Sequence, residues 1–294
     1  MENSTARGDS AASQQSRTAE RPGTDRVKTG IQLHTLRGLD ASLPETIRRV
    51  GNAGFDGVEF AGTLADADLD AVETAMHEAD VEVAAAHVDW PDLRTDLDGV
   101  VERYTRLGCR RLVNPHLGID QVISDRAVRD TADQLARTGA RLADRGVEFY
   151  YHNAPHDLRP QFREDRLGGL LSLGPIPALF GDRATALLDA VAHPAPDEIR
   201  ERTALGQIYT RTVDRSLRFE IDVGSVAMAG YEPGTVLDLV GDKLDLVHLT
   251  EGADVESTVR AARRNDAEWV IYGDDHPDDP AVALRRGADA LVDR

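Results

Sequence analysis

Cysteine and long apolar runs are scarce in this sequence of 294 residues. Cys109 is the one cysteine, so the chain has neither an intramolecular disulfide framework nor a cysteine-rich zinc site. No apolar run approaches the roughly 20 residues that cross a bilayer, and the first residues lack the apolar stretch of a secretory signal. These absences predict a cytoplasmic protein with no membrane partner.

Lysine is almost as rare, since Lys28 and Lys243 are the only two. The 34 basic residues are therefore nearly all arginine, and they face 52 acidic residues for a net charge of −18. Such an acidic surface is typical of a halophilic protein in a salt-rich cytoplasm, where screening weakens self-repulsion. A GC-rich genome, which favours Arg, Ala, Asp and Gly, is the alternative explanation. In either case no basic stripe is present, so we expect no nucleic-acid partner.

The chain divides into a tail and one large domain. Residues 1–27 are rich in Ser, Thr, Ala, Gly, Arg and Gln, which predicts a disordered N-terminal tail. From residue 28 to residue 294, strand-like apolar runs alternate with helical patterns. About 250 residues is a usual length for a barrel of alternating strands and helices, and the hydrophobic content of 41% is enough for a sizeable core.

Eight strand-like runs are each followed by a helical pattern. The strands are predicted at 31–36, 55–61, 81–88, 111–116, 147–152, 217–222, 244–248 and 267–272. The helices are predicted at 43–53, 67–79, 97–107, 125–144, 204–212, 235–240, 255–264 and 280–292. This alternation predicts an α/β fold, a (β/α)8 TIM barrel, rather than an open doubly wound sheet. No Gly-x-Gly-x-x-Gly follows an early strand, which argues against a dinucleotide-binding domain.

The alternation is interrupted after the fifth strand. Residues 158–202 carry Gly-Gly, Pro-Ile-Pro and Pro-Ala-Pro clusters around one short helical segment at 182–191. This stretch is too long for an ordinary loop, so we expect an insertion or a lid within the single barrel domain.

Polar side chains gather at the carboxyl ends of the predicted strands. Five of the nine histidines lie there, together with acids and amides. The full set is His34, Glu59, His87, Asn114, His116, His152, Asn153, Asp222, His248, Asp274 and Asp275. Because the carboxyl ends of the strands of a barrel meet at one rim, where the loops build the active site, we expect these residues to share one site.

Three of these residues predict a metal centre. His152, Asp222 and His248 end the fifth, sixth and seventh strands and would supply two imidazoles and one carboxylate. Such ligands suit a divalent Mn, Co, Zn or Fe ion, whereas Mg would require more oxygen ligands. A divalent metal there would polarise a carbonyl and acidify a neighbouring C–H or O–H.

The remaining polar residues are assigned to proton transfer or to substrate binding. The carboxylates predicted to move a proton are Glu59, Asp157, Glu251 and Asp275. The residues expected to bind the substrate are His34, His87, Asn114, His116 and Asn153.

Seven stretches, taken in order, resemble one known family. They are GIQLHTLR (30–37), AGFDGVEFAG (53–62), AHV (86–88), YHN (151–153), EIDVG (220–224), VHLTE (247–251) and EWVIY (268–272). With these stretches the chain resembles the xylose isomerase-like TIM-barrel superfamily, in its sugar phosphate isomerase/epimerase branch, which includes inosose dehydratase-like enzymes. The resemblance covers residues 29–291 outside the insertion. It implies a divalent metal held at the ends of strands five to eight, with His152, Asp222 and His248 at the first three positions.

The sequence departs from that family at several positions. The resemblance implies a fourth ligand, a Glu that ends strand eight and also serves as acid/base, but Gly273 stands there. Asp157, Ser225 and the pair Thr250-Glu251 differ from the family residues at their positions as well. Three outcomes stay open: Asp274 or Asp275 replaces the Glu by a small shift, three protein ligands suffice, or the metal site is lost.

Three functions follow from the sequence. The first is a divalent-metal-dependent isomerase, epimerase or dehydratase that acts on a small sugar, sugar phosphate or polyol by proton transfer next to a metal-polarised carbonyl. The second, motivated by Gly273, is a divergent barrel that is catalytically weak or inactive and binds a sugar-like ligand. The third, an endonuclease IV-like repair enzyme, is disfavoured because the rim offers too few carboxylates for a multi-metal cluster. The expected partner is a small sugar-like substrate, and formation of a homo-oligomer is left open.

Overall fold

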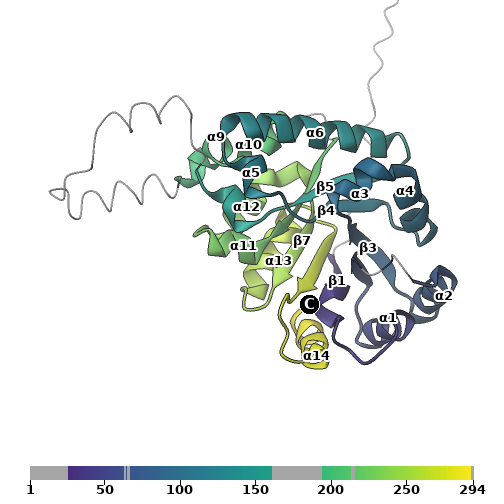
Figure 1. The fold of residues 1–294 in the computed structure, drawn as a ribbon. Helices are drawn as coiled ribbons and strands as arrows, with labels where there is room; N and C mark the ends of the chain where they lie inside the picture. Colours follow the sequence, from purple (N-terminus) through teal and green to yellow (C-terminus); the bar gives the residue numbers. More distant parts are fainter. Residues whose placement is uncertain (1–25, 63, 65–66, 161–193, 213–215, 293–294) are drawn as a thin grey trace, which may run out of the picture.

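The computed structural model describes residues 26–62, 64, 67–160, 194–212 and 216–292. Its centre is a closed barrel of eight parallel strands that follow one another in chain order, with the eighth strand pairing with the first. The helices lie outside this barrel (Figure 1). The (β/α)8 TIM barrel predicted from the sequence is therefore confirmed.

The strands and the long helices occur where the sequence predicts them. The strands are β1 (Lys28–Gln32), β2 (Gly57–Ala61), β3 (Glu82–His87), β4 (Arg111–Asn114), β5 (Glu148–His152), β6 (Arg218–Asp222), β7 (Leu244–Thr250) and β8 (Trp269–Gly273). The long helices are α1 (Leu43–Asn52), α2 (Leu69–Ala79), α4 (Leu97–Arg106), α6 (Asp125–Ala143), α10 (Ala204–Arg211), α12 (Pro233–Val240), α13 (Val255–Arg264) and α14 (Pro280–Leu291). Within the described part of the chain, no helix is long and apolar enough to cross a membrane.

Helix α1 shows how local sequence sets these boundaries. Ser42 caps the helix by accepting a hydrogen bond from the Glu45 backbone N–H, and the Glu45 carboxylate accepts one from the Ser42 backbone N–H at 2.8 Å. This reciprocal capping satisfies two of the N–H groups that a helix start leaves unpaired. Ile47 and Val50, one turn apart, are fully buried on the inner face of the helix. The chain leaves the helix at Gly54, whose φ of +90° is a conformation that favours glycine.

Several short helices were not expected from the sequence. They are η1 (Leu33–Leu36), α3 (Trp90–Thr95), α5 (Ile119–Val122), η2 (Pro155–Leu158), η4 (Pro196–Glu198), α9 (Ile199–Arg202), α11 (Val223–Met228) and η5 (Gly241–Lys243). Most follow the carboxyl end of a strand or precede a long helix. They are one or two turns long, which is too short to produce a visible 3.6-residue periodicity.

Several strand boundaries differ from the prediction: β2 begins at Gly57, and β4 ends at Asn114, which places His116 in the loop after the strand. The first strand begins at Lys28, paired with Trp269 of β8, and ends at Gln32. His34 therefore lies in η1 and not on a strand, which corrects the predicted strand at 31–36. Strand β7 extends two residues beyond His248 to Thr250, because Thr250 still pairs with Gly273 of β8.

The predicted insertion lies mostly outside the described residues, which omit 161–193 and with them the helical segment expected at 182–191. Its two flanks meet, because Pro160 and Thr203 form an isolated antiparallel bridge. The predicted tail likewise falls outside the described residues up to residue 25, whereas Val27 is buried against the core.

The barrel interior holds a layer of mostly apolar side chains, and polar groups lie nearer the carboxyl ends of the strands. One cluster of buried side chains comes from strands alone, so it lies inside the barrel: Ala84, Ala85, Val113, Tyr150, Leu246, Trp269 and Ile271. Since side chains alternate along a strand, the residues two positions beyond Tyr150 and Leu246 point inward as well. His152 follows Tyr150 in this way, and His248 follows Leu246.

A buried ion pair joins the amino-terminal ends of β6 and β7. Asp245 is fully buried, accepts hydrogen bonds from the Arg218 guanidinium, and also accepts one from the Tyr150 hydroxyl at 2.8 Å. Removal of one partner from such a pair leaves the other charge buried without compensation, which costs about 3–5 kcal/mol.

We predict that Asp245→Ala lowers the free energy of unfolding by about 3–5 kcal/mol, because the buried ion pair with Arg218 and the hydrogen bond from the Tyr150 hydroxyl are both lost. Denaturant titration followed by circular dichroism measures the change. Glu256→Ala is the control, since Glu256 pairs with Arg260 on an exposed helix face. A similar loss of stability in both variants would contradict this account of the buried pair.

Candidate metal centre

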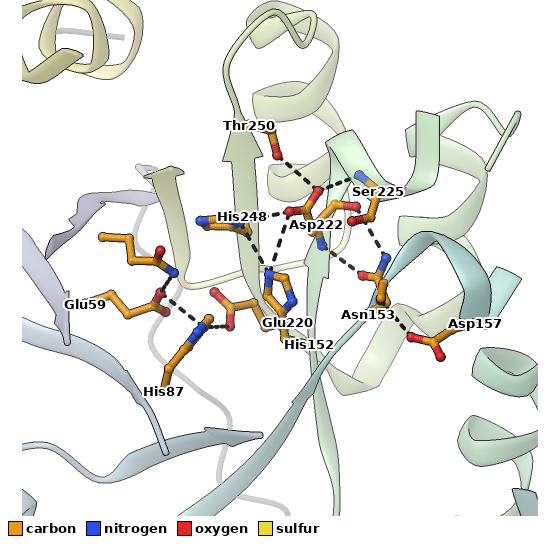
Figure 2. Close-up of polar contacts among 12 residues, drawn as sticks. Glu59, His87, His152, Asn153, Asp157, Glu220, Asp222, Ser225, His248 and Thr250 are labelled. Carbon is orange, nitrogen blue, oxygen red and sulfur yellow. Dashed lines mark hydrogen bonds and ion pairs between the residues drawn. The ribbon is translucent and has the colours of Figure 1, made fainter. Parts of the chain in front are cut away.

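Neighbouring strands bring the three predicted metal ligands together at the carboxyl end of the barrel. His152, Asp222 and His248 lie on β5, β6 and β7, and Asp222 is directly opposite His248 in the strand pairing. The Oδ2 atom of Asp222 is 3.1 Å from Nδ1 of His248 and 3.7 Å from Nε2 of His152. The same two imidazole nitrogens are 3.4 Å apart, and the three side chains point toward one another (Figure 2).

The chemistry and spacing of these donors fit a divalent metal ion. Ligands bound about 2.1 Å from a tetrahedral or octahedral metal are roughly 3.0–3.4 Å apart, close to the separations of 3.1, 3.4 and 3.7 Å found here. Two imidazoles and one carboxylate suit Mn, Co, Zn or Fe and leave coordination positions for substrate oxygens. The identity of the metal stays a prediction.

Asp222 is held in place by three neighbours. Its Oδ1 atom accepts hydrogen bonds from the Ser225 backbone N–H at 2.6 Å and from the Thr250 hydroxyl at 3.0 Å, which leaves Oδ2 facing the two histidines. Asn153 accepts a hydrogen bond from the Asp222 backbone N–H at 2.9 Å. Such supporting contacts fix the orientation of a metal-binding carboxylate.

The electrostatics of the three groups are strongly linked. Burial raises the pKa of Asp222, but the hydrogen bond and charge of His248 outweigh burial and hold that pKa well below its usual range. Burial lowers the pKa of His248, yet the hydrogen bond and charge of Asp222 raise it to about 9. Burial and the neighbouring His248 lower the pKa of His152 well below its usual value, which favours its neutral form. Metal ligation requires neutral imidazoles, so binding would release the His248 proton.

Because Gly273 has no side chain, the His248 ring can occupy the space beside it. A Cβ atom built on Gly273 would lie 2.0 Å from Nε2 of His248. A side chain at the end of β8 would therefore displace the imidazole in its present position. Nε2 of His248 is buried and has no hydrogen-bond partner among the described residues.

A second group of polar side chains lies one step deeper in the barrel. Nε2 of His87 is 3.2 Å from Oε1 of Glu59 and 3.0 Å from Oε2 of Glu220, and Gln32 donates to Glu59 at 2.7 Å. Both carboxylates are fully buried. Burial raises the pKa of each to about 7, and for Glu59 the charge of Glu220 adds to that effect. Burial lowers the pKa of His87.

A cleft of about 600 Å³ opens above these groups. Seven of the predicted site residues line it: His34, His87, His116, His152, Asp222, His248 and Asp275. The structure therefore brings the predicted metal ligands, three of the predicted substrate contacts and one predicted proton-transfer carboxylate to a common space.

The other predicted site residues lie outside this cleft. Glu59 is behind Gln32 and His87. Asn114 donates to the His116 backbone carbonyl at 3.2 Å, and Asn153 supports Asp222 as described. Asp157 is buried and accepts hydrogen bonds from the Tyr151 hydroxyl and the Ala154 backbone N–H. Glu251 is exposed and pairs with Arg286.

The sequence prediction missed several residues near the site, among them Gln32, Arg103, Thr250 and Glu220. Gln32 and Arg103 line the cleft, Thr250 bonds to Asp222, and Glu220 contacts His87. A signal for Glu220 was present, because a residue two positions before Asp222 on one strand points to the same side. Arg103 lies on helix α4, where nothing in the pattern separates it from other surface arginines.

Comparison with known proteins gives similarity in structure only. No family model matches the sequence, and no curated protein matches it. A sugar phosphate isomerase/epimerase from Parabacteroides distasonis ATCC 8503 is 15% identical with a TM-score of 0.65, over 93% of this chain and 97% of that one. A family 2 AP endonuclease from Brucella melitensis is 14% identical with a TM-score of 0.59, over 90% and 99%. A D-psicose 3-epimerase, solved with D-fructose, is 11% identical with a TM-score of 0.60, over 90% and 96%.

The chain thus has the fold of the xylose isomerase-like TIM-barrel proteins, and the resemblance inferred from the sequence is confirmed at the level of the fold. The same fold carries epimerases and an endonuclease. The function must therefore be argued from the side chains of the site.

We predict that Gly273→Ala weakens the binding of a divalent metal at least tenfold, because the added Cβ forces the His248 ring out of position. Isothermal titration with Mn²⁺ in a high-salt buffer measures the affinity. Gly30→Ala is the matched control, since a Cβ there would meet its nearest atoms at 3.5 Å, an ordinary contact distance. Equal affinities in Gly273→Ala and the wild type would show that the His248 position does not matter for metal binding.

Proposed function

We propose that the chain is a divalent-metal-dependent isomerase, epimerase or dehydratase for a small sugar or polyol. The observation that carries this proposal is the convergence of His152, Asp222 and His248 at the rim of the barrel, facing the cleft. In TIM-barrel enzymes the active site is built at this rim. The proteins of similar structure that are described as a sugar isomerase/epimerase and as a sugar epimerase support the proposal.

The roles of the residues follow from their positions. His152, Asp222 and His248 would hold the metal, and Ser225 and Thr250 would fix the Asp222 carboxylate. The metal, when bound, would polarise a substrate oxygen and make the adjacent C–H more acidic. Substrate hydroxyls would hydrogen-bond to polar side chains that line the cleft, namely Gln32, His34 and His116.

Asp275 is the best candidate for the group that moves the proton. Among the four carboxylates predicted for this role, it alone lines the cleft, and it is exposed there. Glu59 is fully buried behind Gln32, and Asp157 is bound to Tyr151. Glu251 is paired with Arg286 on the surface. Asp275 lies two residues beyond Gly273, so it would bring a carboxylate back to the β8 edge of the site.

The cleft suits a small polar substrate. Its volume of about 600 Å³ is within the range of small-molecule pockets. Its described lining carries four aspartates, Asp89, Asp92, Asp222 and Asp275, against one arginine, Arg103. A polyanion such as a nucleic-acid backbone would be repelled by this charge balance. The charge balance therefore supports a sugar-like substrate over the endonuclease alternative.

A barrel that binds a sugar-like ligand without turnover is the second candidate. Gly273 favours it, because no carboxylate extends from the end of β8 and the His248 ring fills that space. This candidate differs from the first in one measurable respect: ligand binding would persist while no substrate of the class would be converted.

We predict that Asp275→Asn lowers kcat for a converted keto-sugar or inosose by about 10²–10⁴, since general acid–base catalysis contributes that much. The amide keeps the shape of the side chain but cannot accept the proton. Steady-state kinetics across a panel of keto-sugars and inososes measures the change, with metal content determined on the same sample. Asp278→Asn in the same exposed loop is the control. Unchanged kcat in Asp275→Asn would remove Asp275 from the reaction, and no conversion by the metal-loaded wild type would favour the binding candidate.

A further inference from the structure

A side pocket of about 370 Å³ adjoins the cleft. It lies between α3, the end of β4, α5 and α6, and the residues of these elements that line it include Trp90, Arg94, Asn114, Gln121 and Gln134. Asp89 and His116 line both the side pocket and the cleft, so the two spaces are neighbours. Both residues are exposed, and a ligand that extends from the cleft would reach the side pocket past them.

Three amide side chains of the side pocket each use one end within the protein. Asn114 and Gln134 donate through their amide nitrogens to backbone carbonyls, each at 3.2 Å. Gln121 accepts through Oε1 from the Gly118 backbone N–H at 2.8 Å. Because each partner is a backbone group of one kind, these bonds fix which end of each amide is oxygen and which is nitrogen.

The other end of each amide is available to a ligand. Among the described residues, Oδ1 of Asn114, Oε1 of Gln134 and Nε2 of Gln121 have no hydrogen-bond partner. Asn114 is 1% exposed, so its oxygen is held in a largely buried position where an unpaired polar group is costly. The side pocket therefore offers two acceptors and one donor.

This combination favours a hydroxylated ring over an anion. A sugar hydroxyl both donates and accepts, so one ring can pair with all three groups. A carboxylate or a fully ionised phosphate only accepts, so it would leave the oxygens of Asn114 and Gln134 unpaired. The single positive charge of the lining, Arg94, is balanced by Asp89. Trp90 adds aromatic surface, which is common in pockets for small molecules.

We propose that the side pocket is a second sugar subsite and that the substrate is a glycoside of two linked rings. One ring would lie in the cleft beside His152, Asp222 and His248, and the other would lie in the side pocket. The volumes of about 600 and 370 Å³ are each within the range of small-molecule pockets. This inference rests on the proposed function, because it names the substrate class of the same site.

The experiment compares the affinities of single and linked sugars by isothermal titration, without turnover. The probes are glucose, the disaccharides maltose, cellobiose and trehalose, and glucose 6-phosphate, added to full-length protein in high-salt buffer with Mn²⁺. We expect at least one disaccharide to bind about fivefold or more tightly than glucose, because the second ring gains hydrogen bonds in the side pocket.

Gln134→Ala tests whether the side pocket causes this preference. The variant should weaken the binding of the preferred disaccharide about threefold to tenfold, the effect of one lost hydrogen bond, and leave the affinity for glucose unchanged. Asn52→Ala, which removes an exposed amide on α1, is the matched control and should keep both affinities. Gln121→Ala provides a second test if Gln134→Ala does not fold, as judged by circular dichroism.

Three results would overturn the proposal. The first is a wild type that binds no disaccharide more tightly than glucose. The second is a preference that both Gln134→Ala and Gln121→Ala retain, because the second ring then lies elsewhere. The third is tighter binding of glucose 6-phosphate alone, which would indicate an anion subsite. A disaccharide preference without any conversion of sugars would contradict the proposed function but not the second subsite, so the two failures are distinguishable.

Discussion

The parallel pairing of β6 with β7 is the constraint on which the candidate site depends. It sets Asp222 opposite His248, and the 3.1 Å contact between them orients both side chains toward His152 on β5. A shift of one residue in this register would turn one of the two side chains to the outside of the barrel. The buried ion pair of Arg218 with Asp245 joins the same two strands at their amino-terminal ends. The register of this pairing shifts between Phe219 and Glu220, so the two pairs lie on opposite sides of that irregularity.

The His248 ring on β7 occupies the space beside Gly273 at the end of β8. A residue with a side chain at position 273 would compete with the His248 ring for one volume, and glycine resolves the competition in favour of the ring. The candidate metal centre then offers two imidazoles and one carboxylate, without a ligand from β8. Carboxylates remain nearby at Asp275 on the cleft and at Glu59 and Glu220 below it. Carboxylates are therefore present around the site although none extends from the end of β8.

Much of the fold could be predicted from the sequence because the same pattern, an apolar strand followed by a helix, recurs along the chain. An apolar strand of five or so residues is followed by a helix with a recognisable start, as with Ser42 and Glu45 at α1. The candidate metal ligands could be found for the same reason, since each ends a strand. Glu251 was placed on the rim by the same logic, but it follows Thr250, the last residue of an extended β7, and turns to Arg286 on the surface.

What could not be predicted depends on contacts between distant parts of the chain. Asp157 looked like a rim acid, but the Tyr151 hydroxyl and the Ala154 backbone hold it inside the loop after β5. Glu220 contacts His87 because β6 faces β2 and β3 across the closed barrel, and the sequence pattern does not give this contact. The halophilic character, the boundaries of the insertion and the oligomeric state stay predictions, because they concern solvent, residues outside the described part of the chain, and other copies of it.

The most direct test of the account is hydrogen exchange between substrate and solvent. The metal-loaded protein is incubated with a panel of keto-sugars and inososes in deuterated, high-salt buffer, and NMR follows the hydrogens next to the carbonyl. The account predicts that at least one compound gains deuterium at that carbon, that chelation of the metal abolishes the exchange, and that His248→Ala does not support it. Bound metal with no exchange in any compound, or exchange that survives removal of the metal, would contradict the central claim of metal-dependent proton transfer.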